Sequence, residues 1–469
     1  MDNHQKYAER MNRYVTAMNN QMPDRVPVRL FAEEFASKYA GVSNQDAAAD
    51  YDIAFEVTRR CASDLGVDAA MCNGIVNWMG MSSMIGWKAV KFPGIGFPPE
   101  YVTQITEPGE EEEAHLKSDE FEEFAEDPTR FLGEKWLPRF TSHIHCCGEP
   151  VDFRHNMSLI SGAMAFSQYM SDFAKYGELF KAAGVVNANA GTLKAPLDLL
   201  ADKLRGYLLT CFDLYERRDE VIKVCQAMMP HVLKTALNGA DPDRNVPVTI
   251  WMHRGHTPYV SKRDFEEIYW ETLRPVMEEI FKAGHQVLLY AEGNWDDGLE
   301  VFRQLPDASV IFHVDGTDII KARDTLGGKF ALSGGVHNEL LAFGTKEDIE
   351  KRCKFILDNV ANHCGYIMDA GMLIMDDAKT ENVRAMVDYT LEHGVFSSSS
   401  AYRKKPVASS DKPVGLAAEP GNRPAGVCIP WDEFEKEMPA MQGNIEIMKK
   451  AWQVVDSLGY SFLWSNLIW

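Results

Sequence analysis

The stretch at 287–316 constrains this chain most, because it reads as strand, helix and strand in immediate succession. Residues 287–292 and 309–314 are apolar runs of strand length, and the segment between them has helical character. Two strands joined by a helix form a parallel crossover unit. Reactive side chains of parallel α/β folds gather at the carboxyl ends of the strands. Glu292 and His313 are therefore predicted to project into one common site.

The same alternation continues on both sides of this stretch. At least five strand–helix units in succession favour a (β/α)8 barrel over an open sheet. The strands are expected at 26–32, 67–71, 246–253, 287–292, 309–314, 329–335 and 365–371, and the longer helices at 1–20, 44–65, 156–190, 198–239 and 431–458.

Two regions fall outside that pattern. Residues 78–138 are irregular and are expected to form a long excursion over the barrel mouth. Residues 396–430 are rich in Ser, Pro and Gly and read as an extended tail. We therefore predict a barrel domain at 1–395 and a C-terminal extension at 396–469 that packs on the barrel or on a neighbouring subunit.

The charge and the composition disfavour some classes of binding partner. The formal net charge is −21, which disfavours nucleic acid and anionic membranes. No apolar run reaches the ~20 residues that span a bilayer. The first twenty residues lack a secretory apolar core, and nine cysteines without a regular framework indicate a reducing cytoplasm. The apolar ending YSFLWSNLIW suggests a homodimer.

Four segments carry a family resemblance through their order and spacing. They are PDRVPV at 23–28, the helix at 269–284 that enters LLYAEGN, GGV at 334–336 followed by FGTKED, and YIMDAGM with TENVRAMV within 366–387. Together they resemble the uroporphyrinogen decarboxylase superfamily, and most closely its corrinoid-dependent methyltransferase branch. The resemblance spans roughly residues 20–395.

Departures from the family pattern limit which reactions of the family we expect for this chain. Relatives that act on thiols carry His-x-Cys-Gly where this chain has residues 290–293 (YAEG), and a second cysteine where it has Met372. Decarboxylases carry an Arg-Gln-Ala-Gly-Arg element, whereas residues 29–41 read RLFAEEFASKYAG. Porphyrinogen decarboxylation is therefore not expected. The chain looks most like the first methyltransferase component of anaerobic aryl-ether O-demethylases, some of which hold zinc with a Glu and a His about twenty residues apart.

Glu292 and His313 have that spacing. Catalytic zinc takes three protein ligands and keeps one position open. His253, at the end of the neighbouring strand, is the preferred third ligand, with Asp315 and Asp369 as alternatives. Oxygen and nitrogen ligands make a harder site than thiolates, and such a site suits a methoxy oxygen and a developing phenolate.

Further side chains are candidates for substrate contact. Tyr290 lies one pleat repeat before Glu292, so it is predicted to donate a hydrogen bond to the leaving oxygen or to a ligand; the alternative is a packed core tyrosine. Trp78 and Trp251 are predicted to line an aromatic pocket, although such aromatics are often plain core. His256 is an alternative to His253 as the functional histidine.

A rival metal cluster lies at residues 143–147 (HIHCC). Alternation would place His143 and His145 on one strand face, but no matching downstream pair exists. The chain also lacks the Asp-x-His-x-x-Gly motif of cobalamin-binding modules, a Walker A loop and a dinucleotide fingerprint. The corrinoid is therefore expected on a separate protein.

The resemblance implies a zinc-dependent methyltransferase that cleaves an aryl methyl ether. It would pass the methyl group to the Co(I) corrinoid of a partner protein and release a phenol from a methoxylated aromatic compound. One alternative keeps the fold and the corrinoid acceptor but takes a methylamine or a thioether as donor. Another alternative is a non-catalytic homologue whose metal site has decayed.

Overall fold

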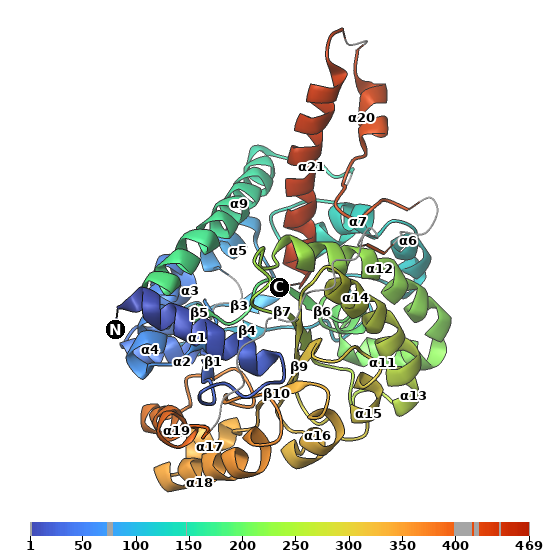
Figure 1. Ribbon diagram of the computed structural model, residues 1–469. Helices are drawn as coiled ribbons and strands as arrows, with labels where there is room; N and C mark the ends of the chain where they lie inside the picture. Colours follow the sequence, from blue (N-terminus) through green and yellow to red (C-terminus); the bar gives the residue numbers. More distant parts are fainter. Residues whose placement is uncertain are drawn as a thin grey trace.

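The computed structural model describes residues 2–72, 78–146, 148–397, 415–416, 422–439 and 442–468. Its centre is a ring of parallel strands surrounded by helices (Figure 1). One sheet has the order β1-β2-β5, and a second has the order β11-β10-β9-β8-β7-β6. The strands are β1 Arg29–Leu30, β2 Ala69–Ala70, β5 Val186–Asn187, β6 Thr192–Lys194, β7 Val248–Met252, β8 Val287–Ala291, β9 Val310–Val314, β10 Ala331–Gly334 and β11 Tyr366–Ile367.

The two sheets make one barrel with eight strand positions. A parallel bridge between Val28 and Met368 joins the β1 side to the β11 side. β5 and β6 share the third position, because β5 pairs with β2 while β6 pairs with β7. The break between them includes Gly191, whose φ of +78° and close approach to the Ala236 carbonyl exclude a side chain. The predicted (β/α)8 barrel is confirmed.

Helices connect consecutive strands on the outside of the ring. They are α4 Tyr51–Leu65, α9 Phe153–Ala182, α12 Arg218–Asn238, α14 Glu271–Lys282, α15 Leu299–Phe302, α16 Ile319–Leu326, α18 Lys346–Ile356 and α19 Thr380–His393. Side chains cap the start of two of these helical segments: those of Ser261 and Thr345 accept hydrogen bonds from the backbone N–H groups of Asp264 and Asp348.

The N-terminal helix α1 (Asn3–Met18) lies across the amino-terminal side of the barrel, against β2, β5, β10 and β11. Its Tyr14 is buried, and Arg13 pairs with buried Asp68 at 2.7 Å. Arg25 reaches the same carboxylate at 2.7 Å. Since α1 closes this end, the opposite, carboxyl end of the strands is where a ligand can enter.

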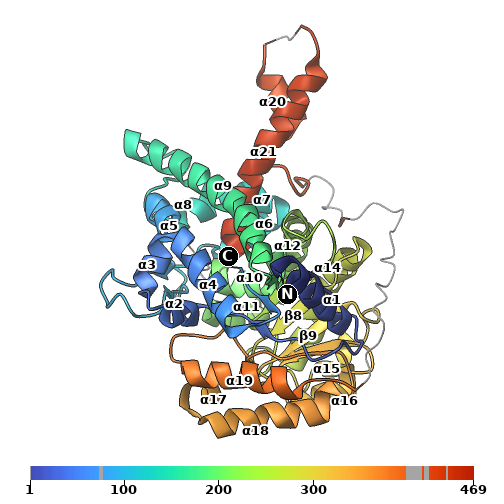
Figure 2. The same ribbon diagram turned by 60° about the vertical axis from the view of Figure 1, so that its left-hand side comes forward.

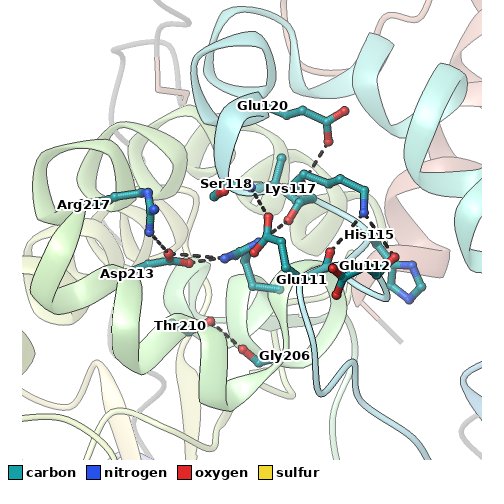
Figure 3. Close-up of polar contacts among 12 residues, drawn as sticks. Glu111, Glu112, His115, Lys117, Ser118, Glu120, Gly206, Thr210, Asp213 and Arg217 are labelled. Atoms are coloured by element: carbon teal, nitrogen blue, oxygen red, sulfur yellow. Dashed lines mark hydrogen bonds and ion pairs between the residues drawn. The ribbon is translucent and has the colours of Figure 1, made fainter.

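The excursion at 78–138 is more regular than predicted. It contains α5 Met79–Ile85, an antiparallel pair of β3 Val90–Lys91 and β4 Gln104–Ile105, α6 Phe121–Glu126, α7 Pro128–Phe131 and the start of α8 Leu137–Phe140. Buried Arg205 fastens it to the barrel, because it pairs with Asp213 at 2.7 Å and with Glu111 at 2.8 Å. Figure 3 shows Glu111 and Asp213 in this network, with Arg217 on the far side of Asp213.

The C-terminal extension is a helical hairpin and not the single helix predicted over 431–458. α20 (Trp431–Glu437) and α21 (Ile445–Ile468) form an arm that projects from the barrel (Figures 1 and 2). The end of α21 docks on its own subunit: Tyr460 hydrogen-bonds His231 at 2.9 Å, and Trp464 donates to Thr129 at 3.1 Å. The apolar ending that suggested a homodimer is therefore covered within one chain, and the dimer stays a prediction.

The structure corrects two predicted helices, and it describes only a small part of the predicted tail. The helix predicted over 156–190 ends at Ala182, so that β5 stands where a helix was expected. The helix predicted over 44–65 is broken at Asp50, whose side chain caps α4 after the short α3 (Asn44–Ala49). Most of the predicted extended tail, residues 398–414 and 417–421, lies outside the described residues.

Within the described ranges, no helix is both long enough and apolar enough to cross a bilayer.

Candidate active site

Neighbouring strands set two layers of side chains near the carboxyl end of the barrel. The register pairs Trp251 with Tyr290 and Tyr290 with His313, so these three form one layer. Because alternate residues of a strand face the same side, His253 and Glu292 form the next layer toward the mouth.

The upper layer contains a chain of three side chains. Nε2 of His253 lies 3.7 Å from Oε1 of Glu292, and Nδ1 of His253 lies 2.8 Å from Oδ2 of Asp202. Asp202 also accepts a hydrogen bond from Lys194, at the end of β6, at 2.8 Å. The side chains of His253 and Glu292 are 23% and 25% exposed, so the pair is accessible from the mouth, whereas Asp202 stands behind it.

This chain of contacts fixes the tautomer of His253. An ionised carboxylate can only accept a hydrogen bond, so Nδ1 of His253 carries the proton directed at Asp202. Nε2 is then the atom that faces Glu292 and any bound molecule. The arrangement is the carboxylate–imidazole pairing that holds a histidine ready for proton transfer.

The electrostatics keep protons on this pair. Burial raises the pKa of Glu292, although His253 and Lys194 oppose the rise. Burial and Lys194 lower the pKa of His253, but Glu292 and Asp202 outweigh them and the net shift is upward. Burial alone would raise the pKa of Asp202, yet Lys194 and His253 hold it well below its usual range.

A second carboxylate supports the end of β7. Asp198 accepts hydrogen bonds from the backbone N–H groups of His253, at 3.2 Å, and Arg254, at 2.7 Å. It also accepts from the Tyr269 hydroxyl at 2.7 Å. Burial raises the pKa of Asp198 to about 6. Because both backbone N–H groups donate to Asp198, they fix the direction in which the His253 side chain points.

His313 is buried in the lower layer and does not join the pair above it. Arg29 donates to Nδ1 of His313 at 3.0 Å, so that Nε2 carries the proton and donates to the Gly371 carbonyl at 2.9 Å. The Ser333 hydroxyl lies 3.0 Å from the same Nδ1. Burial and the Arg29 charge hold the pKa of His313 well below its usual value. Both ring nitrogens of His313 are therefore engaged in hydrogen bonds within the barrel core.

Tyr290 and two further aromatic rings form the floor beneath the pair. The ring of Tyr290 stacks on His313 at 4.1 Å and lies 4.6 Å from Trp251 and 5.4 Å from Phe31. The Tyr290 hydroxyl is buried and has no hydrogen-bond partner within the described parts of the chain. A buried hydroxyl of this kind is costly unless a ligand or a water satisfies it.

The remaining candidates lie at the rim or elsewhere. Asp315 accepts from the backbone N–H of Gly293 at 2.8 Å. A Cβ atom at Gly293 would stand 2.2 Å from Nε2 of His256, which places His256 directly against the loop after β8. Asp369 is buried and pairs with Arg29 at 2.7 Å.

Trp78 and the rival histidine cluster lie away from the pair. Trp78 donates to the Ala49 carbonyl at 2.8 Å and packs against Tyr51 and Tyr169, so the structure does not bring it to Glu292. The ring of His145 lies against that of His155 at an angle of 46°, with the centroids 3.5 Å apart, and Nδ1 of His145 lies 3.1 Å from the Pro150 carbonyl oxygen. Cys147 of this cluster lies outside the described residues.

The geometry of the site matches the predicted zinc ligands only in part. His253 and Glu292 are close enough to share an ion, but His313 has both nitrogens occupied in the layer below. Throughout the described ranges, no three side chains of His, Cys, Asp or Glu lie together as a metal site would need. The residues present therefore do not fit the predicted three-ligand zinc.

The sequence reasoning missed Asp202, Asp198 and Lys194. Lys194 ends β6, and the two aspartates lie in the helical turns that follow it, α10 (Pro196–Leu199) and Leu200–Arg205; β5 was predicted as helix, and β6 fell between two predicted helices. The signal was present in TLKAPLDLLADK at 192–203, where a lysine ends an apolar run and two aspartates stand four residues apart. Four-residue spacing places both aspartates on one helix face.

Comparisons with known proteins agree with this architecture. Residues 180–393 match the family described as uroporphyrinogen decarboxylase (URO-D). A uroporphyrinogen decarboxylase from Paraburkholderia phytofirmans is 32% identical over 85 residues, which are 18% of this chain and 23% of that protein. The matched part thus spans less than a quarter of that relative. A solved methyltransferase from Methanosarcina mazei superposes with a TM-score of 0.52 at 14% identity, over 81% of this chain and 97% of that one.

Proposed function

We infer that this chain, a member of the uroporphyrinogen decarboxylase superfamily through residues 180–393, is a methyltransferase. The methyltransferase of Methanosarcina mazei, which shares the fold along almost its whole length, supports this proposal. The observation that carries it is the pair of His253 and Glu292, 3.7 Å apart at the carboxyl end of the barrel, with Asp202 behind the histidine.

The surroundings of Arg29 argue against a porphyrinogen substrate. Such a substrate carries several carboxylates and needs cationic side chains that are free to bind them. Arg29 is fully buried and already pairs with Asp369 while it donates to His313 and Ser333. It is therefore committed to the core of the barrel.

We propose an aryl methyl ether as the methyl donor. Trp251 is the partly exposed member of an aromatic cluster with the buried rings of Tyr290 and Phe31, and it offers a face of the kind that packs on a flat ring. The unpartnered hydroxyl of Tyr290 is suited to hydrogen-bond an oxygen substituent of that ring. His253 and Glu292 stand one layer above, where the ether oxygen of a ring on this floor would lie.

The proton balance of ether cleavage matches these residues. When the methyl group leaves the ether oxygen as a cation equivalent, the electron pair of the broken C–O bond stays on the oxygen. The resulting phenolate takes up one proton and leaves as a phenol. A phenolate is a poor leaving group, so an acid that donates as the bond breaks accelerates the step. His253, held by Asp202 and facing Glu292, is placed to donate that proton from Nε2.

The methyl acceptor is proposed to be the Co(I) corrinoid of a separate protein. That protein would dock at the carboxyl end of the barrel, opposite α1, since the pair is accessible from that side. No step assigned to this chain passes through zinc, because the residues present do not fit the predicted ligand set.

The proposal is tested by methyl transfer to a chemically defined acceptor. The full chain is incubated with cob(I)alamin and, in separate reactions, guaiacol, veratrole, trimethylamine or dimethyl sulfide. Phenol is measured by chromatography and methylcobalamin by absorbance. We expect equal amounts of phenol and methylcobalamin with at least one methoxyarene. Methylcobalamin from only the amine or the sulfide would overturn the ether assignment, and none from any donor, with a cognate corrinoid protein also supplied, would overturn methyl transfer.

A further inference from the structure

The long helix α9 exposes apolar side chains on the face that points away from the protein. Four exposed residues recur along it at intervals of four, three and four, and we call them the α9 seam: Phe153, Met157, Ile160 and Met164. The opposite face of the helix packs inward, because α5 lies directly against Gly162. A helix that is apolar on its outward face as well is normally covered by another element or another molecule.

The projecting arm carries a second row of residues with the same spacing. Four exposed residues of α21 recur at intervals of four, three and four, and we call them the α21 seam: Ile447, Ala451, Val454 and Leu458. The other side of α21 is occupied by α20, since Trp452 stacks on Phe434 with ring centroids 3.5 Å apart. Alternating steps of three and four residues are the heptad pattern by which two helices pack against each other.

The two seams do not cover each other within one chain. α9 and α21 cross where the ring of Phe166 meets that of Phe462, with centroids 5.7 Å apart. From this crossing, the amino-terminal half of α9 and the arm diverge (Figure 2). Each seam lies beyond the crossing, because Met164 precedes Phe166 and Leu458 precedes Phe462, and both seams span the same number of residues. The chain therefore presents two matched, separate helix faces to the solvent.

The distribution of charge indicates which partner covers them. The chain has a net charge of −21, so two copies repel each other except where their surfaces carry no net charge. Residues 155–171, which include most of the α9 seam, contain no Asp, Glu, Lys or Arg. Residues 445–458, around the α21 seam, contain two acidic and two basic side chains. A basic partner would be attracted to the acidic surface elsewhere, whereas a second, equally acidic copy can approach along these neutral helices.

We propose that this chain forms a two-fold dimer in which the α9 seam of each copy packs against the α21 seam of the other. The two-fold axis makes the same contact form twice, so that all four seams of the dimer are covered. This surface differs from the C-terminal ending, whose Tyr460 and Trp464 are already buried within one chain. The dimer does not depend on the proposed methyl transfer, because neither seam includes a residue of the candidate active site.

The test measures the oligomeric state of the full chain by analytical ultracentrifugation at about 1 to 100 μM. We expect a monomer–dimer equilibrium for the wild type. Ile160→Glu and Val454→Lys each place a charge in the centre of one seam, so each should raise the dissociation constant at least about thirtyfold. Both side chains are more than half exposed in one chain, so circular dichroism should show an unchanged fold.

Phe343→Glu is the matched control. Phe343 is 80% exposed at the end of α17 (Asn338–Phe343), on the side of the barrel away from α9 and α21 (Figure 1). This variant should dimerise as the wild type does. A wild type that stays monomeric over the whole range, or Ile160→Glu and Val454→Lys variants that both dimerise as tightly as the wild type, would overturn the proposal.

A mixture of the two charged variants tests which seams meet. In a dimer of one copy of each, the introduced carboxylate of Ile160→Glu and the introduced ammonium of Val454→Lys lie in the same contact, and the other contact keeps its original residues. The mixture should therefore form a 1:1 heterodimer, although neither variant dimerises alone. Pairing of α9 with α9, or of α21 with α21, would leave one of the two variants dimeric by itself and would overturn the reciprocal arrangement, as would a mixture that stays monomeric.

Discussion

Nε2 of His253 lies 3.7 Å from Oε1 of Glu292, and each of the two residues directly follows the last residue of its strand. The two side chains come from adjacent parallel strands whose register places them side by side. The distance is slightly longer than a direct hydrogen bond, so a ligand oxygen can contact both groups.

Glu292→Gln should remove most of the activity while the fold is kept. The amide has the same shape but lacks the negative charge that helps to raise the pKa of His253, the proton donor, so kcat should fall by about 10²–10³-fold and KM should change little. Steady-state phenol release measures both constants. Glu300→Gln, on exposed α15, is the control. A variant that keeps more than a third of the wild-type kcat would remove Glu292 from the chemistry.

Asp202→Asn should shift the pH dependence of activity. Asp202 helps to raise the pKa of His253, so its loss lowers that pKa. The protonated histidine is lost as the pH rises through its folded-state pKa, and the alkaline limb of kcat/KM should therefore move down by about one pH unit. Asp219→Asn, an exposed change on α12, should leave the limb in place. A purely structural role for Asp202 predicts lower activity with an unmoved limb.

Tyr290→Phe should separate substrate binding from stability. Because the hydroxyl has no partner in the described structure, its removal should leave Tm unchanged or slightly higher. Loss of a hydrogen bond to the substrate should raise KM about 2–10-fold. The measurements are a thermal melt and a KM for the best methoxyarene. A fall of several degrees in Tm with an unchanged KM would contradict a contact with substrate.

His313→Asn should affect folding and leave metal content unchanged. The imidazole accepts from Arg29 and donates to Gly371, so the variant should lose about 2–4 kcal/mol of unfolding free energy. The zinc content of the purified protein should equal that of the wild type. Metal analysis of His313→Asn beside Glu292→Ala decides this point, since a loss of zinc in the His313 variant alone would restore His313 as a ligand.

Arg205→Met should loosen the excursion over the barrel. The substitution leaves Asp213 buried without its closest partner, at a cost of about 3–5 kcal/mol. Arg217→Met is the matched control, because Arg217 binds the same carboxylate at 3.0 Å but is 34% exposed, and it should cost less than about 1 kcal/mol. Denaturant unfolding measures both. Equal costs would mean that burial at Arg205 does not determine the strength of this contact.

Strand positions were predictable where the pattern was apolar. β7, β8 and β9 read VTIWM, VLLYA and VIFHV, runs of large apolar residues that are typical of buried parallel strands. The third strand position escaped notice because residues 185–194 read VVNANAGTLK, which is small and polar in the middle. Those residues are small because Gly191 packs directly on the Ala236 carbonyl of α12, and sequence alone does not reveal that contact.

The zinc prediction exceeded what spacing can establish. Glu292 and His313 do end adjacent strands, as expected, but spacing along a chain does not give the register between strands. The register pairs Tyr290 with His313, which leaves His313 one layer below Glu292. The side chain that does meet Glu292 is His253, and its partner Asp202 lies in a helical segment to which no site residue had been assigned.

The projecting arm formed by α20 and α21 should make the self-association of this protein depend on ionic strength. Ile447, Val454, Val455 and Leu458 of α21 are each more than half exposed, although the chain carries a net charge of −21. In dilute salt, repulsion between the negative charges keeps two such molecules apart, and the apolar side chains of the arm stay exposed to water, which is unfavourable in free energy. As salt shortens the Debye length below ~10 Å, that repulsion weakens while the gain from covering the arm remains. Self-association through the arm should therefore increase with salt, opposite to the behaviour of an assembly held by ion pairs.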